Sequence, residues 1–162
     1  MNNHNHDRQR LIEYTLDEAK KQGATSAEAD IAMGAGLTVT TRLGELEKVE
    51  HEREKGLGVT VYFDKKKGNA SSSDLSDQAI IETVRAACDI ARYASDDEAA
   101  GLADAELMAK EYPDLDIYHP WNISAEDAAN IAIECESIAF NSDKRITNSD
   151  GCILSSYSGE HM

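Results

Sequence analysis

Apolar residues alternate with polar ones most clearly between residues 27 and 73. At the start of this stretch the apolar side chains occupy every second position: Ala27, Ala29, Ile31, Met33, Ala35, Leu37 and Val39. Positions between them include Glu28 and Thr38. Because successive side chains of a strand point to opposite faces of a sheet, the pattern predicts a half-buried strand. Gly34 and Gly36 do not shift the alternation, which favours one bent or bulged strand over two separate ones.

Three more strands are predicted after this one. Residues 43–45 indicate a turn, and residues 46–55 form a strongly charged strand with few aliphatic side chains. Residues 56–63 alternate again and place four apolar side chains on one face: Leu57, Val59, Val61 and Phe63. A polar turn at 64–68 precedes a short strand at 69–73. Together these segments predict an antiparallel meander of about four strands.

Helical periodicity flanks the meander on both sides. Amphipathic helices are expected over about 7–22, 76–94 and 124–140, with caps at Asp7 and Ser124, and at Ser76 for the second helix. The apolar face expected for the third helix consists of Ala128, Ile131, Ala132, Cys135, Ile138 and Ala139. We therefore predict an α+β fold, in which amphipathic helices pack on an antiparallel β-meander sheet.

The end of the chain indicates a β-hairpin within residues 143–162. Strand-like segments at 145–149 and 152–158 flank Asp150-Gly151, a typical tight turn. An isolated two-stranded hairpin is marginally stable in water, and its open edges can pair with other strands. We therefore expect this hairpin to lead toward a following domain that this chain lacks, or to pair with a second copy of the chain as a homodimer.

Length and composition indicate one ordinary domain. The chain has 162 residues, of which 41% are hydrophobic and 29% charged. Residues 1–6 are polar and are predicted to be a disordered tail before an N-terminal α+β domain over 7–142. No apolar run approaches the roughly 20 residues that span a bilayer, and the N-terminus lacks the apolar core of a signal peptide. These features predict a cytoplasmic protein without a membrane segment.

The net charge of −15 argues against direct binding of nucleic acid, which needs a basic surface. The three cysteines, Cys88, Cys135 and Cys152, are far apart in sequence and lack the paired spacing of zinc ligands. Their odd number argues against a disulfide framework and fits a reducing compartment. Cys88 and Cys135 are expected to be small buried side chains on the apolar faces of helices.

The sequence contains no complete catalytic motif. HExxH, a Gly-rich phosphate loop, GxSxG and CxxC are all absent from it. His51 lies between Glu50 and Glu52, but in a strand both carboxylates point away from the imidazole, so a metal site is disfavoured. His119 lies near Trp121 and is expected to help anchor a loop. We therefore predict no catalytic, metal-binding or cofactor-binding residue, no specific zinc binding and no peptidase activity by the isolated chain.

Four segments together resemble one known family. They are residues 37–47 (LTVTTRLGELE), 56–62 (GLGVTVY), 68–76 (GNASSSDLS) and 144–151 (KRITNSDG). In order and spacing they are similar to the N-terminal part of the TldD/PmbA family, historically called modulators of DNA gyrase, and within it to the PmbA (TldE) branch. The resemblance covers nearly the whole chain and implies an N-terminal fragment of a longer protein.

The resemblance implies a role in a zinc metallopeptidase complex. In this family, TldD and TldE subunits together degrade flexible peptides and take part in microcin maturation and antitoxin turnover. The zinc motif, HExxxH, belongs to the TldD subunit and matches no position here, so zinc is expected only in the TldD-type partner. The implied function is a non-catalytic domain that works with that partner and the peptide substrate. The alternative is a free-standing acidic protein-binding module of the gyrase-modulator kind.

Overall fold

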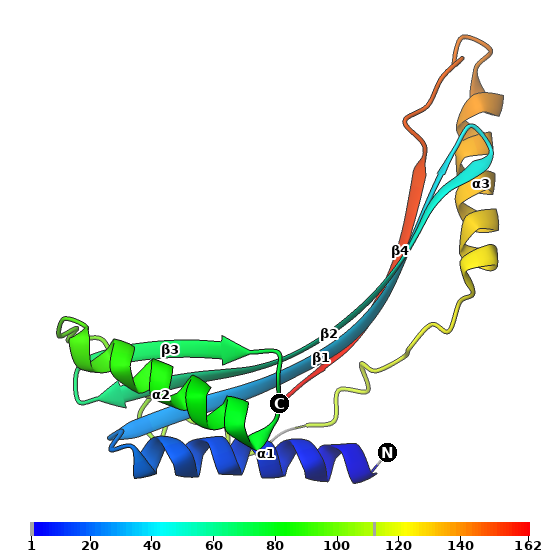
Figure 1. Ribbon diagram of the computed structural model, residues 1–162. Helices are drawn as coiled ribbons and strands as arrows, with labels where there is room; N and C mark the ends of the chain where they lie inside the picture. Colours follow the sequence, from blue (N-terminus) through cyan, green and yellow to red (C-terminus); the bar gives the residue numbers. More distant parts are fainter. Residues whose placement is uncertain (1, 112) are drawn as a thin grey trace. The chain divides into compact units, whose positions relative to one another are not determined.

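The computed structural model describes residues 2–111 and 113–162, with side chains from His6 onward. It contains three helices and four strands: α1 (Asn2–Lys21), β1 (Ser26–Arg42), β2 (Glu45–Phe63), β3 (Lys66–Ser72), α2 (Asp77–Tyr93), α3 (Ala125–Ser142) and β4 (Cys152–His161) (Figure 1). The strands form one antiparallel sheet in the order β3-β2-β1-β4. The predicted α+β class, with a consecutive meander of strands, is confirmed.

The chain divides into two compact units. The first unit contains residues 1–33, 54–114 and 160–162, and the second contains residues 34–53 and 115–159. Three strands of the sheet contribute residues to both units, whereas each helix belongs to one unit only. We describe each unit separately.

The first unit has an aliphatic core between the sheet and the helices α1 and α2. Of the strand residues predicted to face inward, Ile31, Leu57, Val59 and Val61 are buried there, whereas Ala27, Ala29, Met33 and Phe63 are half-buried and Ala35 is exposed. One stripe of α2 is buried against them: Ile80, Val84, Ala87, Cys88 and Ala91. Ser76 caps α2, since its hydroxyl accepts a hydrogen bond from the Ala79 amide at 3.4 Å, as predicted. Alternation in the strands and helical spacing in α2 thus converge on one core.

Close packing between β3 and α2 depends on Gly68. A Cβ added at this position would collide with the backbone oxygen of Ala87 and would lie 3.0 Å from the Cα of Ala91. Neither atom belongs to a side chain that could rotate away. The missing side chain therefore allows the helix backbone to lie directly against the strand.

In the second unit, α3 packs on the strand residues that belong to this unit. Ala128 and Ala129 lie against Leu37 and Val39, with Leu154 of β4 at the border of the cluster. The Ser124 cap predicted for this helix is confirmed, because its hydroxyl accepts from the Asp127 amide at 3.0 Å. The small alanine side chains bring the helix close to the strands.

Residues 45–63 form a single strand, β2, where the sequence predicted two strands meeting at residues 55 and 56. The composition changes there from charged to apolar because burial changes along the strand, and no turn interrupts it. The side chains of 45–55 are mostly exposed, whereas Leu57, Val59 and Val61 are buried. Charged residues are compatible with strand backbone when water reaches them. β3 begins at Lys66, three residues earlier than predicted.

The predicted C-terminal hairpin is wrong. Residues 145–149 form no strand, and the second arm is the single strand β4, which pairs with β1. At its far end, the backbone groups of Ile31 and Met162 exchange two hydrogen bonds of 2.9 and 3.0 Å. Pairing with β1 gives β4 a long ladder and a place for Leu154 in the core, neither of which a lone hairpin offers.

Helix α1 begins at Asn2, so it includes residues 2–6, which the sequence predicted to be a disordered tail, and Asp7 is not its cap. Residues 2–6 contain no Gly or Pro, and extending an existing helix costs less than starting one. Among the helices described, none combines the length and the apolar character needed to cross a bilayer.

Candidate functional site

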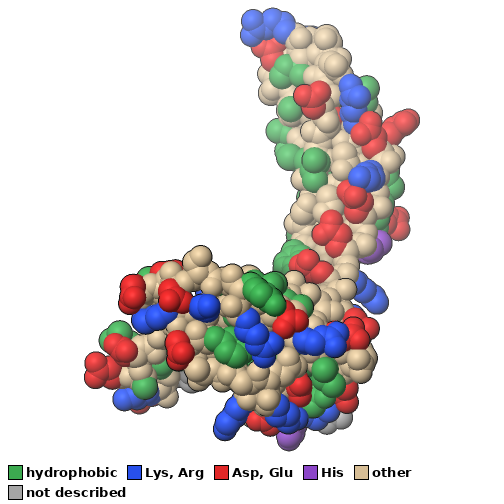
Figure 2. All heavy atoms as spheres, turned by 60° about the vertical axis from the view of Figure 1, so that its left-hand side comes forward, with side chains coloured by type: hydrophobic (Ala, Val, Ile, Leu, Met, Phe, Trp, Pro, Cys, Tyr) green, Lys and Arg blue, Asp and Glu red, His purple; other side chains and the backbone are tan. Residues whose placement is uncertain are grey.

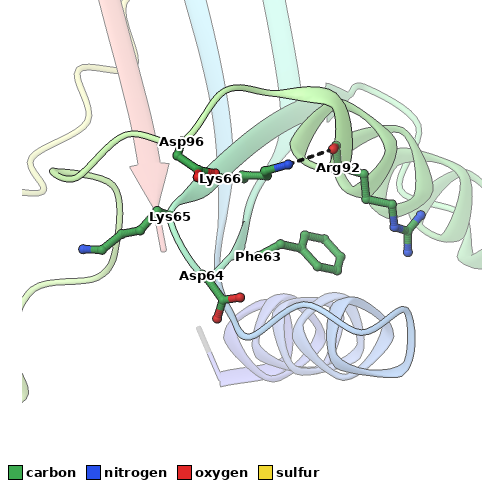
Figure 3. Close-up of a pocket in the computed structure, with 6 residues that line it drawn as sticks. All are labelled: Phe63, Asp64, Lys65, Lys66, Arg92 and Asp96. Carbon is green, nitrogen blue, oxygen red and sulfur yellow. Dashed lines mark hydrogen bonds between the residues drawn. The ribbon is translucent and has the colours of Figure 1, made fainter.

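A hollow of about 390 Å³ in the first unit lies beside the β2–β3 turn. Figure 3 shows its lining residues, with the Lys66 amine directed at the backbone oxygen of Arg92, 3.4 Å away. The Arg92 guanidinium lies 5.1 Å from the centre of the Phe63 ring and also donates to the Gln22 carbonyl at 2.8 Å. The amine of Lys65 donates to the Glu98 carbonyl at 3.0 Å. These cations hold the turn and α2 together, so the hollow is best explained as structural.

A second groove, of about 270 Å³, lies in the second unit. Its walls come from β1, β2, β4 and the segment that leads into α3: Ala35, Gly36, Leu37, His51, Pro120, Trp121, Asn122, Ile123, Ser156 and Ser158. It combines an indole, an imidazole, two hydroxyls and a side-chain amide with strand backbone. We take this groove as the candidate functional site, because its polar groups are available to a ligand and its aromatic side chain can provide apolar contact.

Trp121 enters the groove through a tight backbone turn. The Ile123 amide donates to the Trp121 carbonyl at 2.9 Å, and Ile123 packs on the core of the second unit. The indole itself stays 57% exposed. His119 is also exposed, and its Nε2 lies 2.6 Å from the backbone oxygen of Asp116 and 3.7 Å from the Asp116 carboxylate. His119 and Trp121, which the sequence predicted to anchor a loop, are both exposed, and in this segment Ile123 packs on the core.

His51 contributes to the groove from the charged part of β2. Its side chain is exposed, and Glu50 beside it is paired with Lys48 at 2.7 Å. Among the residues that the structure describes, no three His, Cys, Asp or Glu side chains are arranged to hold a metal ion. In the same residues no buried side-chain polar atom lacks a hydrogen-bond partner. The site therefore offers contacts for binding, and the described residues bring no acid–base pair or metal ligands together in it.

The other face of β1 carries an aromatic side chain on a glycine platform. The Tyr157 ring of β4 lies over Gly34 and Gly36, where an added Cβ at Gly34 would collide with the phenol and one at Gly36 would lie 3.4 Å from the ring. Thr38 and Ser155 exchange a hydrogen bond of 3.0 Å on the same two strands. The two glycines that interrupt the predicted strand thus make room for Tyr157.

Glu136 is a buried carboxylate of the second unit that sequence reasoning missed. It lies on α3, is only 5% exposed, and accepts hydrogen bonds from the amides of Leu43 at 3.0 Å and Gly44 at 2.9 Å. Leu43 and Gly44 have φ values of 53° and 79°, which match the turns favoured in two-residue hairpins. The Gly44 amide, followed by a Ser149 hydrogen bond, lowers the pKa of Glu136. The carboxylate therefore holds the β1–β2 turn against α3.

Helical spacing contained the signal for Glu136. It follows Ala128 and Ala132 at intervals of four residues, and these three side chains together with Ala129 are the buried residues of α3. The predicted stripe contained Ala128 and Ala132 correctly, but it also included Ile131, Cys135 and Ile138, which are exposed, and it left out Glu136. The amides that donate hydrogen bonds to this carboxylate come from a turn far away in sequence, so helical spacing alone does not reveal its partners.

The structure brings two of the three cysteines together. Cys152 on β4 lies near Cys135 on α3, which contributes to the surroundings of the Cys152 thiol. Burial is the main cause that raises the pKa of Cys152, followed by its contact with Cys135. Cys88 is buried in the core of the first unit, as predicted, whereas Cys135 is exposed.

Comparison with known proteins places the chain among peptidase-related sequences. Residues 27–91 match the sequence profile of the PmbA/TldA metallopeptidase domain 1. The chain is 49% identical over 144 residues to a protein of Escherichia coli O157:H7 named Metalloprotease PmbA. The aligned region covers 89% of this chain and 31% of that relative. The chain thus spans about a third of the length of that relative.

Two solved structures share the fold. One, from Bacteroides thetaiotaomicron, is described as a modulator of DNA gyrase and matches with a TM-score of 0.76 at 23% identity, over 96% of this chain and 35% of that one. The other is TldE from Thermococcus kodakarensis, with a TM-score of 0.68 at 15% identity, over 93% of this chain and 37% of that one. At these identities the two structures support the fold alone.

Proposed function

We propose that this chain, which belongs to the PmbA/TldD family, is the non-catalytic N-terminal domain of a TldE-type subunit in a zinc metallopeptidase complex. The observation that carries the proposal is the 49% identity to Metalloprotease PmbA over 89% of the chain. The match to the first domain of that metallopeptidase family supports the same assignment.

Zinc fits the described part of this chain poorly. No group of three suitable ligands is found there, and the Cys152 thiol, whose pKa is raised, resists the deprotonation that zinc binding needs. We therefore assign no step of metal chemistry to these residues. The proposed source of zinc is the TldD-type partner subunit, and the proposed work of this domain is to bind and position.

The groove of the second unit is the proposed contact for the flexible peptide substrate. An extended peptide could place an apolar side chain against Trp121 and hydrogen-bond to Ser156, Ser158 and Asn122. Such contacts select for an accessible, unfolded segment more than for one sequence. Microcin precursors and antitoxins are the proposed substrate classes because the family resemblance implies them.

The test uses the full-length subunit that carries this sequence, assayed with and without its TldD-type partner on a flexible fluorogenic peptide. We expect zinc-dependent cleavage only with both subunits present. Trp121→Ala should raise KM on the order of fivefold, the loss of part of an aromatic contact. Tyr93→Ala is the control, since Tyr93 is 92% exposed on α2 of the other unit. Cleavage by this subunit alone, or equal KM values for both variants, would contradict the proposal.

A second candidate, an acidic protein-binding module without a peptidase role, rests on the net charge of −15. On the face that Figure 2 shows, acidic side chains alternate with Lys and Arg and form no continuous patch. Salt-sensitive binding of a basic protein, with no association with the TldD-type subunit, would favour this candidate over the first.

A further inference from the structure

The sheet of the second unit has two unlike sides. α3 packs on the side that carries Leu37 and Val39 of β1 and Leu154 of β4. Successive side chains of a strand point to opposite faces, so Ile153 and Tyr157 of β4 lie on the other side, where they are 66% and 58% exposed. In the described part of the chain, α3 is the only helix of this unit, so no helix of the unit covers that second side.

An exposed aromatic ring and a carboxylate flank the same glycine on this uncovered side. A Cβ added at Gly36 would lie 3.4 Å from the Tyr157 ring and 3.7 Å from the Cβ of Glu52. A Cβ at Gly34 would collide with the phenol of the same tyrosine. Since neither glycine has a side chain, the ring lies directly over the backbone of β1. The tyrosine of β4 and the glutamate of β2 therefore border one position of the strand between them.

The charge on this side is negative. Glu50 lies on the same side of β2 as Glu52, two residues earlier, but it is paired with Lys48 at 2.7 Å. Glu52 is exposed and makes no hydrogen bond or ion pair with the residues that the structure describes. The second unit contains eleven Asp and Glu against five Lys and Arg, a net charge of −6. Charge complementarity therefore favours a cationic ligand at Glu52.

We propose that this uncovered side binds an arginine side chain of an extended segment of another protein. A guanidinium is planar, stacks on the face of an aromatic ring and donates two hydrogen bonds to one carboxylate. Tyr157 and Glu52 provide the ring and the carboxylate on the two sides of Gly36. Lysine has a compact ammonium group that cannot stack in this way, so it should bind less tightly. The proposal does not depend on the peptidase role.

The residues around the ring favour an extended polypeptide over a small cation. Ile153, Ser155 and Tyr157 form a row along β4, in which neighbours are about 7 Å apart. Alternate side chains of an extended segment have the same spacing, so an apolar residue two positions from the arginine can reach Ile153. Ser155 and Thr38 share a hydrogen bond of 3.0 Å between their hydroxyls, which retain capacity for the backbone of such a segment.

The experiment measures binding of the full-length protein to a fluorescent Gly-Ser peptide that contains one arginine and, two positions away, one leucine. Matched peptides contain citrulline, which is neutral and of similar shape, or lysine in place of arginine. By fluorescence polarisation at low salt we expect the arginine peptide to bind about tenfold more tightly than the citrulline peptide and about threefold more tightly than the lysine peptide. A benzophenone beside the arginine should crosslink to β1 or β4.

Variants of the protein locate the binding groups. Tyr157→Leu should weaken binding of the arginine peptide about fivefold and Glu52→Gln about threefold, whereas Tyr157→Phe keeps the ring and should bind normally. Gly34→Ala keeps both groups but displaces the ring, so it should also weaken binding and gives the readout if Tyr157→Leu unfolds. Tyr93→Leu and Glu134→Gln are the controls, because both residues are exposed on helices.

Three outcomes would overturn the proposal. They are equal affinities for the arginine and citrulline peptides, losses in Tyr157→Leu and Glu52→Gln no larger than those in the two controls, and crosslinks confined to the first unit. Circular dichroism of each variant shows that it is folded. No cleavage is measured, so the result is separate from the test of the proposed peptidase role.

Discussion

The two units of this protein contain different parts of the same sheet, and each is stabilised internally by a different kind of contact. In the first unit, α1 and α2 bury a broad set of aliphatic side chains against the strands. In the second unit, α3 makes a narrow contact through alanines, and a buried carboxylate holds a turn to the helix. Apolar side chains such as Ile131 and Ile138 stay exposed there.

This difference indicates a division of labour. Dense aliphatic packing gives stability but leaves little surface for recognition. The second unit has less packing, an exposed indole and a groove. We therefore expect changes in the first unit to act mainly on stability and changes in the second to act mainly on binding.

The largest effect is expected from Gly68→Ala in the first unit. The new Cβ would meet the backbone of α2 and force the helix away from β3, at a cost of about 3 kcal/mol in the free energy of unfolding. Gly56→Ala is the matched control, because its nearest neighbour, the Ser72 carbonyl, is 4.0 Å away. Urea unfolding measures both; similar midpoints for the two variants would show that α2 can shift freely.

The same truncation in each unit compares the two cores directly. Val61 and Val39 are both fully buried valines of neighbouring strands. We expect Val61→Ala to lower the free energy of unfolding by about 2.5 kcal/mol, and Val39→Ala by about 1.5 kcal/mol, because fewer aliphatic groups surround Val39. An equal or larger loss at Val39 would show that the second unit is packed as tightly as the first.

Alkaline pH should weaken the first unit through Tyr62. Burial, followed by its hydrogen bond of 2.7 Å to Glu28, raises the pKa of Tyr62 to about 12. A raised pKa in the folded state gives stability that is complete below the unfolded value of about 10 and is lost as the pH rises from there through the folded value. The midpoint of unfolding of the original protein should therefore fall as the pH is raised from about 9 to about 12. In Tyr62→Phe this part of the fall should be missing; identical curves would refute the assignment.

Acid should weaken the second unit through Glu136, so its pH dependence is opposite in direction to that of Tyr62. Its folded pKa is lowered, so its contribution is present above the unfolded value of about 4.3 and is lost as the pH falls through the folded value. Glu136→Gln removes one acceptor and should speed amide exchange at Leu43 and Gly44 by roughly tenfold at neutral pH. It should also remove part of the acid sensitivity.

Glu134→Gln is the control for this last and smallest effect, because Glu134 is an exposed carboxylate on the same helix. Asp74 has a pKa lowered by the Ser76 amide and also weakens the protein in acid. The difference between the two glutamate variants, and not the acid curve itself, therefore isolates Glu136. Equal exchange rates in both variants would mean that the turn holds without the carboxylate.

Local patterns in the sequence determined much of this fold. The alternation around Ile31 and Val59 predicted which strand faces are buried, and Ser76 and Ser124 correctly marked the starts of two helices. These features depend on neighbours within a few residues, such as strand pleating, helical spacing and capping of free amides. The family resemblance rests on the same local segments and is confirmed.

Only the tertiary structure decided which distant segments meet. β4 pairs with β1 and not with residues 145–149, and Glu136 binds a turn more than ninety residues away in sequence. Each of these contacts depends on how elements dock, since a strand edge accepts any compatible partner and a carboxylate accepts any amide within reach. Period and spacing tell which face of an element is buried, but the docking of whole elements decides what it is buried against.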